Sequence, residues 1–149
     1  MSTQTVVVGV DGSAASIAAL RVAVEEAGRR SAPLRVVSAY DLPVYWALPA
    51  GPALGVTPRE IGEAVLRETQ SVVDQFLAGV ADPPKHEVLA VAGPAGRVLV
   101  DAAEDAELLV VGHRGRGGFS SMLLGSVGLA CVIHAPCTVT VVREPSREG

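Results

Sequence analysis

The sequence predicts an α/β protein with a parallel sheet that helices cover on both faces. Five short apolar segments rich in Val and Leu alternate with segments whose apolar residues recur at helical spacing. Hydrophobic residues make up 49% of the 149 residues and aromatic residues only 3%, so the core must be aliphatic, which suits a buried parallel sheet. Because neither a repeat nor a linker divides the chain, we expect a single domain over residues 1–149.

The first elements follow from apolar runs and a helix cap. A Val-rich strand is predicted over residues 5–11, and Ser13 is placed to cap the helix that follows. The apolar side of that helix is formed by Ile17, Leu20, Val24 and Ala27. The helix ends near residues 28–31, and a second strand covers residues 34–40.

A capping box predicts the start of the second helix. The loop over residues 41–56 is rich in Pro, Gly and Ala, and it ends at Thr57, Pro58 and Glu60, which have the spacing of a cap. The predicted inward side chains are Ile61, Val65, Val72, Phe76 and Val80.

The remaining elements complete the alternation. We expect a third strand over residues 86–92, a short helix within 93–106 and a fourth strand over 107–112. A glycine-rich loop follows, and then a helix over about 123–134 and a fifth strand over 137–143. Residues 144–149 are a polar tail that we expect to be frayed.

Candidate functional residues lie where the strands end, which is where ligands bind in open α/β sheets. Asp11 and residues 39–41 lie at the ends of the first two strands, and the loop over residues 112–126 lies at the end of the fourth. This loop places glycines at 112, 115, 117 and 118 before a helix N-terminus, where bare backbone amides attract phosphate. Ser126 adds a hydroxyl, and Arg114 and Arg116 add positive charge.

The glycine spacing matches neither the P-loop nor the dinucleotide fingerprint. It fits the pattern G-x2-G-x9-G-[ST] at Gly112, Gly115, Gly125 and Ser126. With VVVGVDGS at the start and LLGSV…HAPCTVTVV near the end, the chain resembles the ATP-binding branch of the universal stress protein family over almost its whole length.

The resemblance implies a five-stranded, Rossmann-like parallel sheet in the order 3-2-1-4-5, with ATP across the strand ends. Asp11 matches the residue that takes the ribose hydroxyls, Val10 the position beside the adenine, and Ala39 the backbone position that reads the adenine edge. The predicted nucleotide-binding residues are Val10, Asp11, Ala39, Gly112, Arg114, Gly115, Gly125, Ser126 and Val127. Gly128 replaces a second hydroxyl that many nucleotide-binding members carry, which makes ADP, AMP or cAMP alternatives to ATP, with or without Mg²⁺.

Simpler interpretations stay open for several of these residues. Asp11 before Gly12 is also typical of a turn or a helix cap. The glycines after the fourth strand are also typical of an ordinary flexible loop. Arg114 and Arg116 are equally compatible with solvated surface charges. The aromatic residues that could cover either a nucleotide or the core are Tyr40, Tyr45 and Trp46.

The expected function is that of an ATP-binding stress-response regulator or sensor. We identify no set of catalytic or metal-ligating residues. The alternatives are a slow ATPase or nucleotidyl enzyme of the same fold, or an interaction module that binds no nucleotide. The net charge of −4 without a basic patch argues against nucleic acid, and no apolar run spans a bilayer. With no signal peptide and two cysteines expected to be free, we expect a cytoplasmic protein. The resemblance also implies a homodimer through the last strand.

Overall fold

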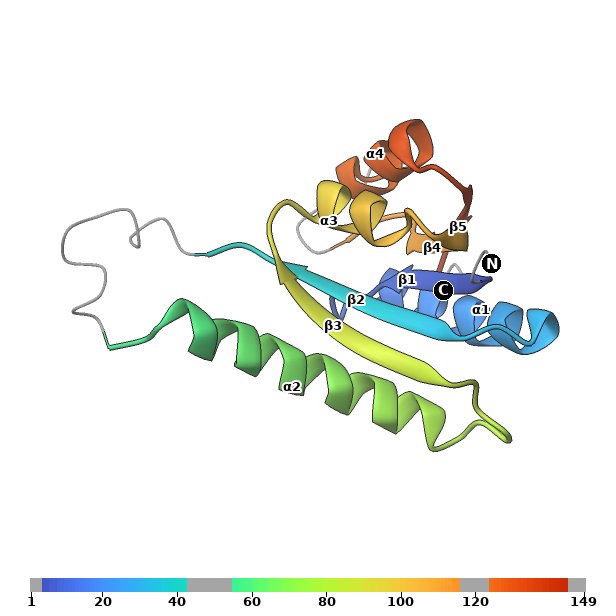
Figure 1. Cartoon of the computed structure of the whole chain (residues 1–149), viewed down its shortest axis with the longest axis horizontal. Coiled ribbons are helices and arrows are strands. Elements are labelled where there is room, and N and C mark those ends of the chain that lie inside the picture. The colour runs from blue at the N-terminus through green and yellow to red at the C-terminus, as the bar shows by residue number, and fades with distance from the viewer. Residues whose placement is uncertain (1–3, 43–54, 116–123, 145–149) are drawn as a thin grey trace, which may run out of the picture.

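The computed structural model describes residues 4–42, 55–115 and 124–144, and Figure 1 shows strands and helices alternating along this chain. The first five elements are β1 (Thr5–Gly9), α1 (Ala14–Arg30), β2 (Leu34–Tyr40), α2 (Pro58–Leu77) and β3 (His86–Ala92). The last four are α3 (Ala95–Ala102), β4 (Ala106–Gly112), α4 (Ser126–His134) and β5 (Thr138–Val142).

The five strands form one parallel sheet in the order β3-β2-β1-β4-β5. The predicted fold class and strand order are therefore confirmed. Central strand β1 pairs on both sides, with Val8 opposite Val36 of β2 and Val110 of β4. Its middle residues are completely buried, which explains the continuous run of valines.

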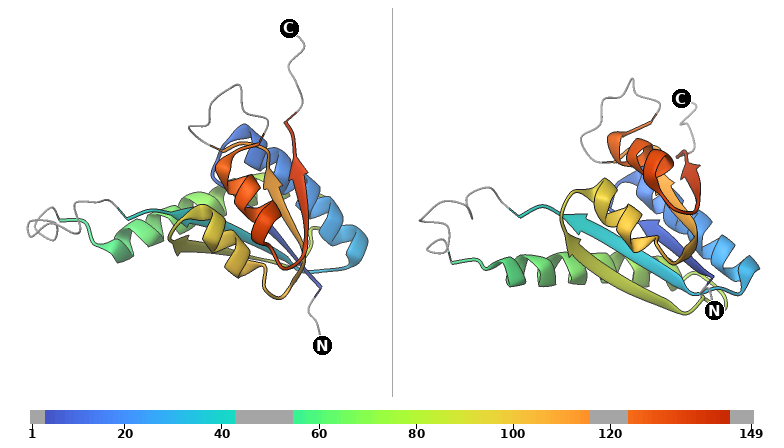
Figure 2. Two further views of the ribbon diagram at one scale, coloured as in Figure 1. Left: turned by 90° about the horizontal axis from the view of Figure 1, so that it is seen from above. Right: turned by 45° about the horizontal axis from the view of Figure 1, so that its top comes forward.

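Two helices cover each face of the sheet (Figure 2). On one face, α1 and α2 pack on alternate sheet residues such as Val6, Val8 and Leu108. On the other face, α3 and α4 pack on the residues between them, including Val7 and Leu109. This layering leaves the carboxyl ends of the strands beside the N-termini of the helices.

Both predicted helix caps are present. Ser13 Oγ accepts the Ser16 N–H at 3.2 Å, and Thr57 Oγ1 accepts the Glu60 N–H at 3.1 Å. The Glu60 carboxylate accepts the Thr57 N–H in return, which completes the capping box. The predicted inward side of α2 is half-buried, whereas the fully buried positions of this helix are Thr69, Val73 and Leu77.

Some predicted boundaries are wrong by a few residues. The first strand ends at Gly9 and not at residue 11, because the chain turns at Gly12, whose φ is +83°. Helix α4 begins at Ser126 and not at residue 123, since residues 124 and 125 are outside helical structure. Of the predicted tail over 144–149, residues 145–149 lie outside the described residues.

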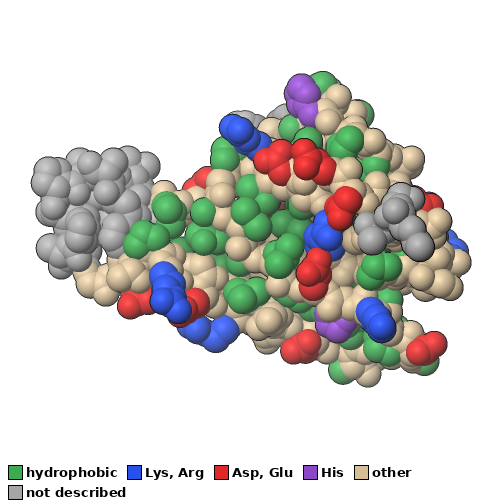
Figure 3. All heavy atoms as spheres, viewed as in Figure 1, with side chains coloured by type: hydrophobic (Ala, Val, Ile, Leu, Met, Phe, Trp, Pro, Cys, Tyr) green, Lys and Arg blue, Asp and Glu red, His purple; other side chains and the backbone are tan. Residues whose placement is uncertain are grey.

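Apolar side chains remain exposed on edge strand β3 and on helix α4. Edge strand β3 exposes Leu89 and Val91, and α4 exposes Leu129, Val132 and Ile133. Figure 3 shows hydrophobic side chains gathered over the middle of one face, with charged side chains around them. Among the described residues, no helix is long and apolar enough to cross a membrane.

Candidate functional site

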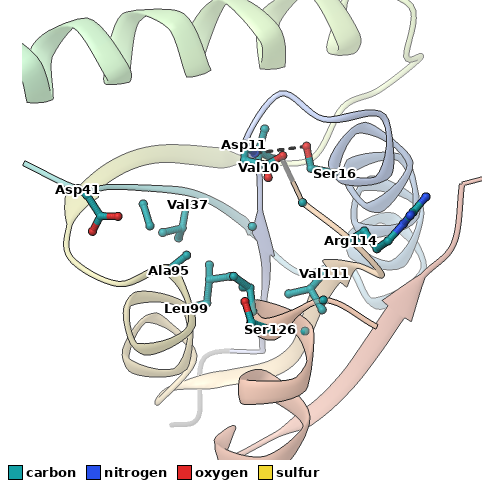
Figure 4. A pocket seen from close by; sticks show the side chains of 17 residues that line it. Val10, Asp11, Ser16, Val37, Asp41, Ala95, Leu99, Val111, Arg114 and Ser126 are labelled. Atoms are coloured by element: carbon teal, nitrogen blue, oxygen red, sulfur yellow. Dashed lines mark hydrogen bonds between the residues drawn. The ribbon is translucent and has the colours of Figure 1, made fainter. Parts of the chain in front are cut away.

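A cavity of about 450 Å³ opens at the carboxyl end of the sheet (Figure 4). It is bounded by the ends of β1, β2 and β4 and by the N-terminal parts of α3 and α4. The structure brings all nine predicted nucleotide-binding residues to its wall, although they come from three separate parts of the chain. Their contact with a nucleotide stays a prediction.

Asp11 forms the turn that connects β1 to α1. Its Oδ1 accepts the Ser13 N–H at 2.9 Å, and its own N–H donates to Ser16 Oγ at 3.3 Å, the bond drawn in Figure 4. The turn that the sequence also indicated is thus present. Because these bonds fix the carboxylate at the cavity wall, the turn and a role in binding are compatible.

Ala39 offers backbone polar groups to the cavity. Val37 O accepts the Val10 N–H at 2.9 Å, and Tyr40 O accepts the Gly93 N–H on the other side of β2. Since backbone direction alternates along a strand, the N–H and C=O of Ala39 point toward β1. Strand β1 has already ended at Gly9. Within the described residues, the N–H and C=O of Ala39 therefore have no neighbouring strand to pair with on this side.

A hydrogen bond between His113 and Gly125 closes the base of the glycine loop. The Gly125 N–H donates to His113 O at 2.6 Å, while the His113 N–H donates to Val142 O at 2.8 Å and extends the sheet toward β5. The amide of Gly125 is therefore used within the protein. Gly125 was predicted to belong to the phosphate loop, but its own N–H is already bonded to His113 O and closes that loop.

The first turn of α4 supplies the amides that a phosphate needs. Gly125 is the N-cap residue and provides no side-chain cap. The first hydrogen bond of the helix runs from Leu129 N to Gly125 O, so the amides of Ser126, Val127 and Gly128 precede it. All three residues line the cavity, which accounts for an apolar Val127 among the predicted residues.

Two glycines allow the chain to approach a neighbouring residue so closely that an added Cβ would force something to move. A Cβ on Gly112 would lie 2.8 Å from the backbone carbon of Ala15, so β4 could not end against α1. A Cβ on Gly115 would lie 2.7 Å from Asp11 Oδ2. These glycines keep the loop and the Asp11 turn together at the cavity.

The model of the universal stress protein family matches residues 2–143. The chain belongs to this family. A universal stress protein of Mycobacterium tuberculosis is 38% identical over 146 residues, which are 95% of this chain and 48% of that protein. A second universal stress protein of the same organism is 31% identical over 145 residues, which are 96% of this chain and 48% of that protein. The chain thus spans about half the length of these curated relatives.

Solved structures of the universal stress protein family have the same fold. UspA from Lactobacillus plantarum is 26% identical, with a TM-score of 0.79 over 96% of this chain and 99% of its own. A universal stress protein in complex with cAMP is 30% identical, with a TM-score of 0.64 over 97% of this chain and all of its own.

Arg114 lines the cavity, but its side chain extends away from the cavity centre in Figure 4. The guanidinium lies 3.9 Å from a carboxylate oxygen of Glu144, after β5. It is therefore held partly by the protein itself. Arg116, the glycines at 117 and 118, Tyr45 and Trp46 lie outside the described residues.

Several cavity residues escaped the sequence analysis. Apolar Val37, Leu99 and Val111 form part of the wall and give no signal beyond that of core residues. Asp41, which belongs to the strand-end residues 39–41 noted in the sequence, also lines the cavity, although it was not among the predicted nucleotide-binding residues. Tyr40 instead lines a smaller cavity of about 240 Å³ beside α2. Within the described ranges, no group of His, Cys, Asp or Glu side chains is arranged to hold a metal.

Proposed function

We propose that this universal stress protein binds an adenine nucleotide, with ATP as the primary candidate, and acts as a nucleotide-dependent regulator of a stress response. The observation that carries the proposal is the cavity itself. One opening at the end of the sheet joins a strand edge, a carboxylate and an uncapped helix N-terminus. These three features fit a base, a ribose and a phosphate chain.

The phosphates are assigned to the first turn of α4. Anions are stabilised at a helix N-terminus by unpaired amides and the helix dipole, each favourable charge contributing about 0.3–1 kcal/mol at an exposed site. The amides of Ser126, Val127 and Gly128 and the Ser126 hydroxyl are the donors that line the cavity there. Tight binding also requires contacts with the rest of the nucleotide.

The ribose and the base are assigned to the other parts of the wall. The Asp11 carboxylate would accept hydrogen bonds from the ribose hydroxyls. The backbone of Ala39 offers one donor and one acceptor, which match N1 and the N6 amino group of adenine. The apolar surface of Val37 and Leu99 would cover the ring. The relative in complex with cAMP supports an adenine nucleotide as the ligand class.

A sensor is favoured over an enzyme because hydrolysis needs a base or a water-orienting group at the terminal phosphate. Among the described residues, the carboxylates that line the cavity belong to Asp11 and Asp41, which we assign to the ribose and base ends. A slow ATPase remains the second candidate function. Phosphate release measured over hours with the pure protein separates the two.

Calorimetry on nucleotide-free protein tests the proposal. We expect binding of ATP, ADP, AMP or cAMP with a dissociation constant in the micromolar range, which corresponds to about 8 kcal/mol. Mass spectrometry of small molecules that copurify with the protein would show which nucleotide is preferred. An absence of heat with all four nucleotides at millimolar concentration contradicts the proposal and favours an interaction module.

We also propose a homodimer that pairs the outer edges of two β5 strands. Strand β5 is at the edge of the sheet, and such an edge promotes pairing with another chain. A cytoplasmic location is in keeping with Cys131 and Cys137, which are both free.

A further inference from the structure

Asp41 is the first residue after β2 and lines the cavity together with Val37 and Ala39. Side chains two apart along a strand share a face, so these three residues line up along the cavity wall. In Figure 4, Asp41 lies on the opposite side of the cavity from Arg114, and the Asp11 turn and Ser126 lie between them. Its carboxylate is thus at the end that we assign to the base.

The structure gives the Asp41 carboxylate no role in holding the fold. Within residues 4–42, 55–115 and 124–144, it takes part in no hydrogen bond or ion pair. Asp11, by contrast, accepts a backbone N–H and shapes a turn. Asp41 is exposed, so its carboxylate retains water until a ligand replaces it. An acidic group with no structural partner at the wall of a ligand cavity needs another explanation.

We propose that Asp41 is a specificity-determining residue that selects a purine with an amino group at position 6. The inference rests on the proposed nucleotide binding and identifies the residue that chooses the base. The Ala39 backbone already favours adenine, because hypoxanthine carries N1–H and O6 where adenine offers an acceptor and a donor, and Asp41 adds a second, charged acceptor at position 6. A carboxylate is an acceptor only, so it favours an amino group and opposes a carbonyl oxygen at the same position.

The discrimination follows from the two hydrogens of the N6 amino group. One is available to the Ala39 carbonyl and the second to the Asp41 carboxylate. Hypoxanthine places O6 there, and the two acceptors repel each other unless water separates them. Hydrogen bonds to charged groups contribute about 1.5–3 kcal/mol, and because Asp41 is exposed we expect the lower end of this range, which is about tenfold in affinity.

The first experiment compares AMP with IMP by calorimetry on the full chain and on Asp41→Asn. The readout is the ratio of the two dissociation constants. Removal of one negative charge improves the binding of every nucleotide phosphate through the long-range field, and this effect cancels in the ratio. We expect the wild-type protein to prefer AMP by about tenfold or more. In Asp41→Asn the preference falls by about tenfold, because the amide can also donate to O6.

A matched control removes the same charge elsewhere. Asp74 is exposed on α2 and lines neither cavity, so Asp74→Asn should leave the ratio of AMP to IMP unchanged. Purine riboside 5′-monophosphate, which has only hydrogen at position 6, provides a second readout. Replacement of AMP by this ligand should weaken binding to the wild-type protein more than binding to Asp41→Ala.

The results distinguish a failure of base selection by Asp41 from a failure of nucleotide binding itself. If AMP binds, but its ratio to IMP is the same in wild type and Asp41→Asn, the role of Asp41 is refuted and nucleotide binding stands. If neither AMP nor ATP binds the wild-type protein, both proposals fail. A loss of all nucleotide binding in Asp41→Asn with an unchanged circular dichroism spectrum would also refute base selection, since it would show a general role in binding.

Discussion

Asp11 and Gly115 come so close that a Cβ on Gly115 would lie 2.7 Å from Asp11 Oδ2. The two residues are separated by more than a hundred positions and belong to the turns after β1 and β4, which are neighbouring strands of the sheet. The approach joins the position assigned to the ribose with the loop assigned to the phosphates. A change at either residue should therefore act on nucleotide binding before it acts on the fold.

Gly115→Asp should abolish nucleotide binding while the protein stays folded. The new carboxylate would face Asp11 at a distance at which two negative charges repel each other and the phosphates. Gly115 is exposed, and the atom that its Cβ would meet is the end of the Asp11 side chain, so a shift of that side chain can relieve the contact without disturbing the core. Calorimetry with ATP and AMP measures the loss, and thermal unfolding checks the fold.

Gly79→Asp is a suitable control for this variant. Gly79 is also exposed, and a Cβ there would meet only one atom, at 3.8 Å, an ordinary contact. The control adds the same charge away from the cavity and should bind nucleotide like the wild-type protein. Unchanged affinity in Gly115→Asp would show that the ligand does not lie between the two turns.

Asp11→Asn should weaken nucleotide binding by about fivefold and change stability little. An Asn side chain retains an oxygen that can accept the Ser13 N–H, so the turn can form. The ribose hydroxyls, however, lose a charged acceptor, and the difference between charged and neutral hydrogen bonds is about 1 kcal/mol. Titration calorimetry and urea unfolding measure the two quantities.

Asp11→Ala completes this comparison. It removes both the ribose acceptor and the acceptor for Ser13 N–H, so it should lower the affinity and also the free energy of unfolding by about 1 kcal/mol. Equal affinities in wild type and both variants would leave Asp11 with its turn as its only role.

The sequence was sufficient to predict the sheet because local and global signals agree. Val6, Val7 and Val8 are buried on both faces of a central parallel strand. Such a strand is a continuous apolar run without alternating polar residues, so the sequence indicates it directly. Ser13 and Thr57 carry caps whose chemistry is local. The positions of the cavity residues also followed, because parallel strands bring their carboxyl ends to one side of the sheet.

The details of the candidate site depend on contacts between distant residues, which the spacing of residues along the sequence does not predict. The bond from Gly125 N to His113 O decides which amides of the loop are left for a ligand, and it forms only when the two ends of the loop meet. The bond from Val10 to Val37 sets where β1 stops and Ala39 becomes an open strand edge. The sequence places Asp41 at a strand end, but only the folded structure shows that it lines the cavity.

Gly128→Ser should raise the affinity for ATP relative to AMP by restoring a hydroxyl beside the phosphates. Gly128 is in the first turn of α4 and lines the cavity, and a Cβ there would lie 2.7 Å from Leu124 Cδ1. That atom is the end of a flexible side chain, so a rotation of Leu124 can make room. One added hydrogen bond to a charged phosphate corresponds to about tenfold. An unchanged ratio of ATP to AMP affinity would place the terminal phosphate elsewhere.

Cys131 should make the stability of the protein depend on alkaline pH. Burial, with a smaller contribution from the nearby Cys137, raises the pKa of this thiol from 9.0 to about 11. A thiol whose pKa is raised by folding stabilises the native state fully below pH 9, and this contribution is lost as the pH rises toward 11. The loss is on the order of 2 kcal/mol.

Urea unfolding at pH 7.5 and pH 10.5 measures this effect when wild type is compared with Cys131→Ala. The variant lacks the ionisable group, so its stability should fall less between the two pH values. Subtraction removes the titration of groups that both proteins share. Equal pH dependence in the two proteins would show that the thiol ionises as easily in the folded state as in the unfolded state.

Hydrogen exchange along β5 should reveal whether its outer edge pairs with a second copy of the chain. Val142 O accepts the His113 N–H from the β4 side, so the backbone groups of Thr140 and Val142 face β4 and those of Val139 and Val141 face outward. In a dimer that pairs two β5 edges, the amides of Val139 and Val141 are protected. Dilution below the dimer dissociation constant should accelerate their exchange and leave that of Thr140 unchanged, and sedimentation at the same concentrations identifies the species. Fast exchange of both outward amides at every concentration, with a monomer in the centrifuge, would contradict pairing through this strand.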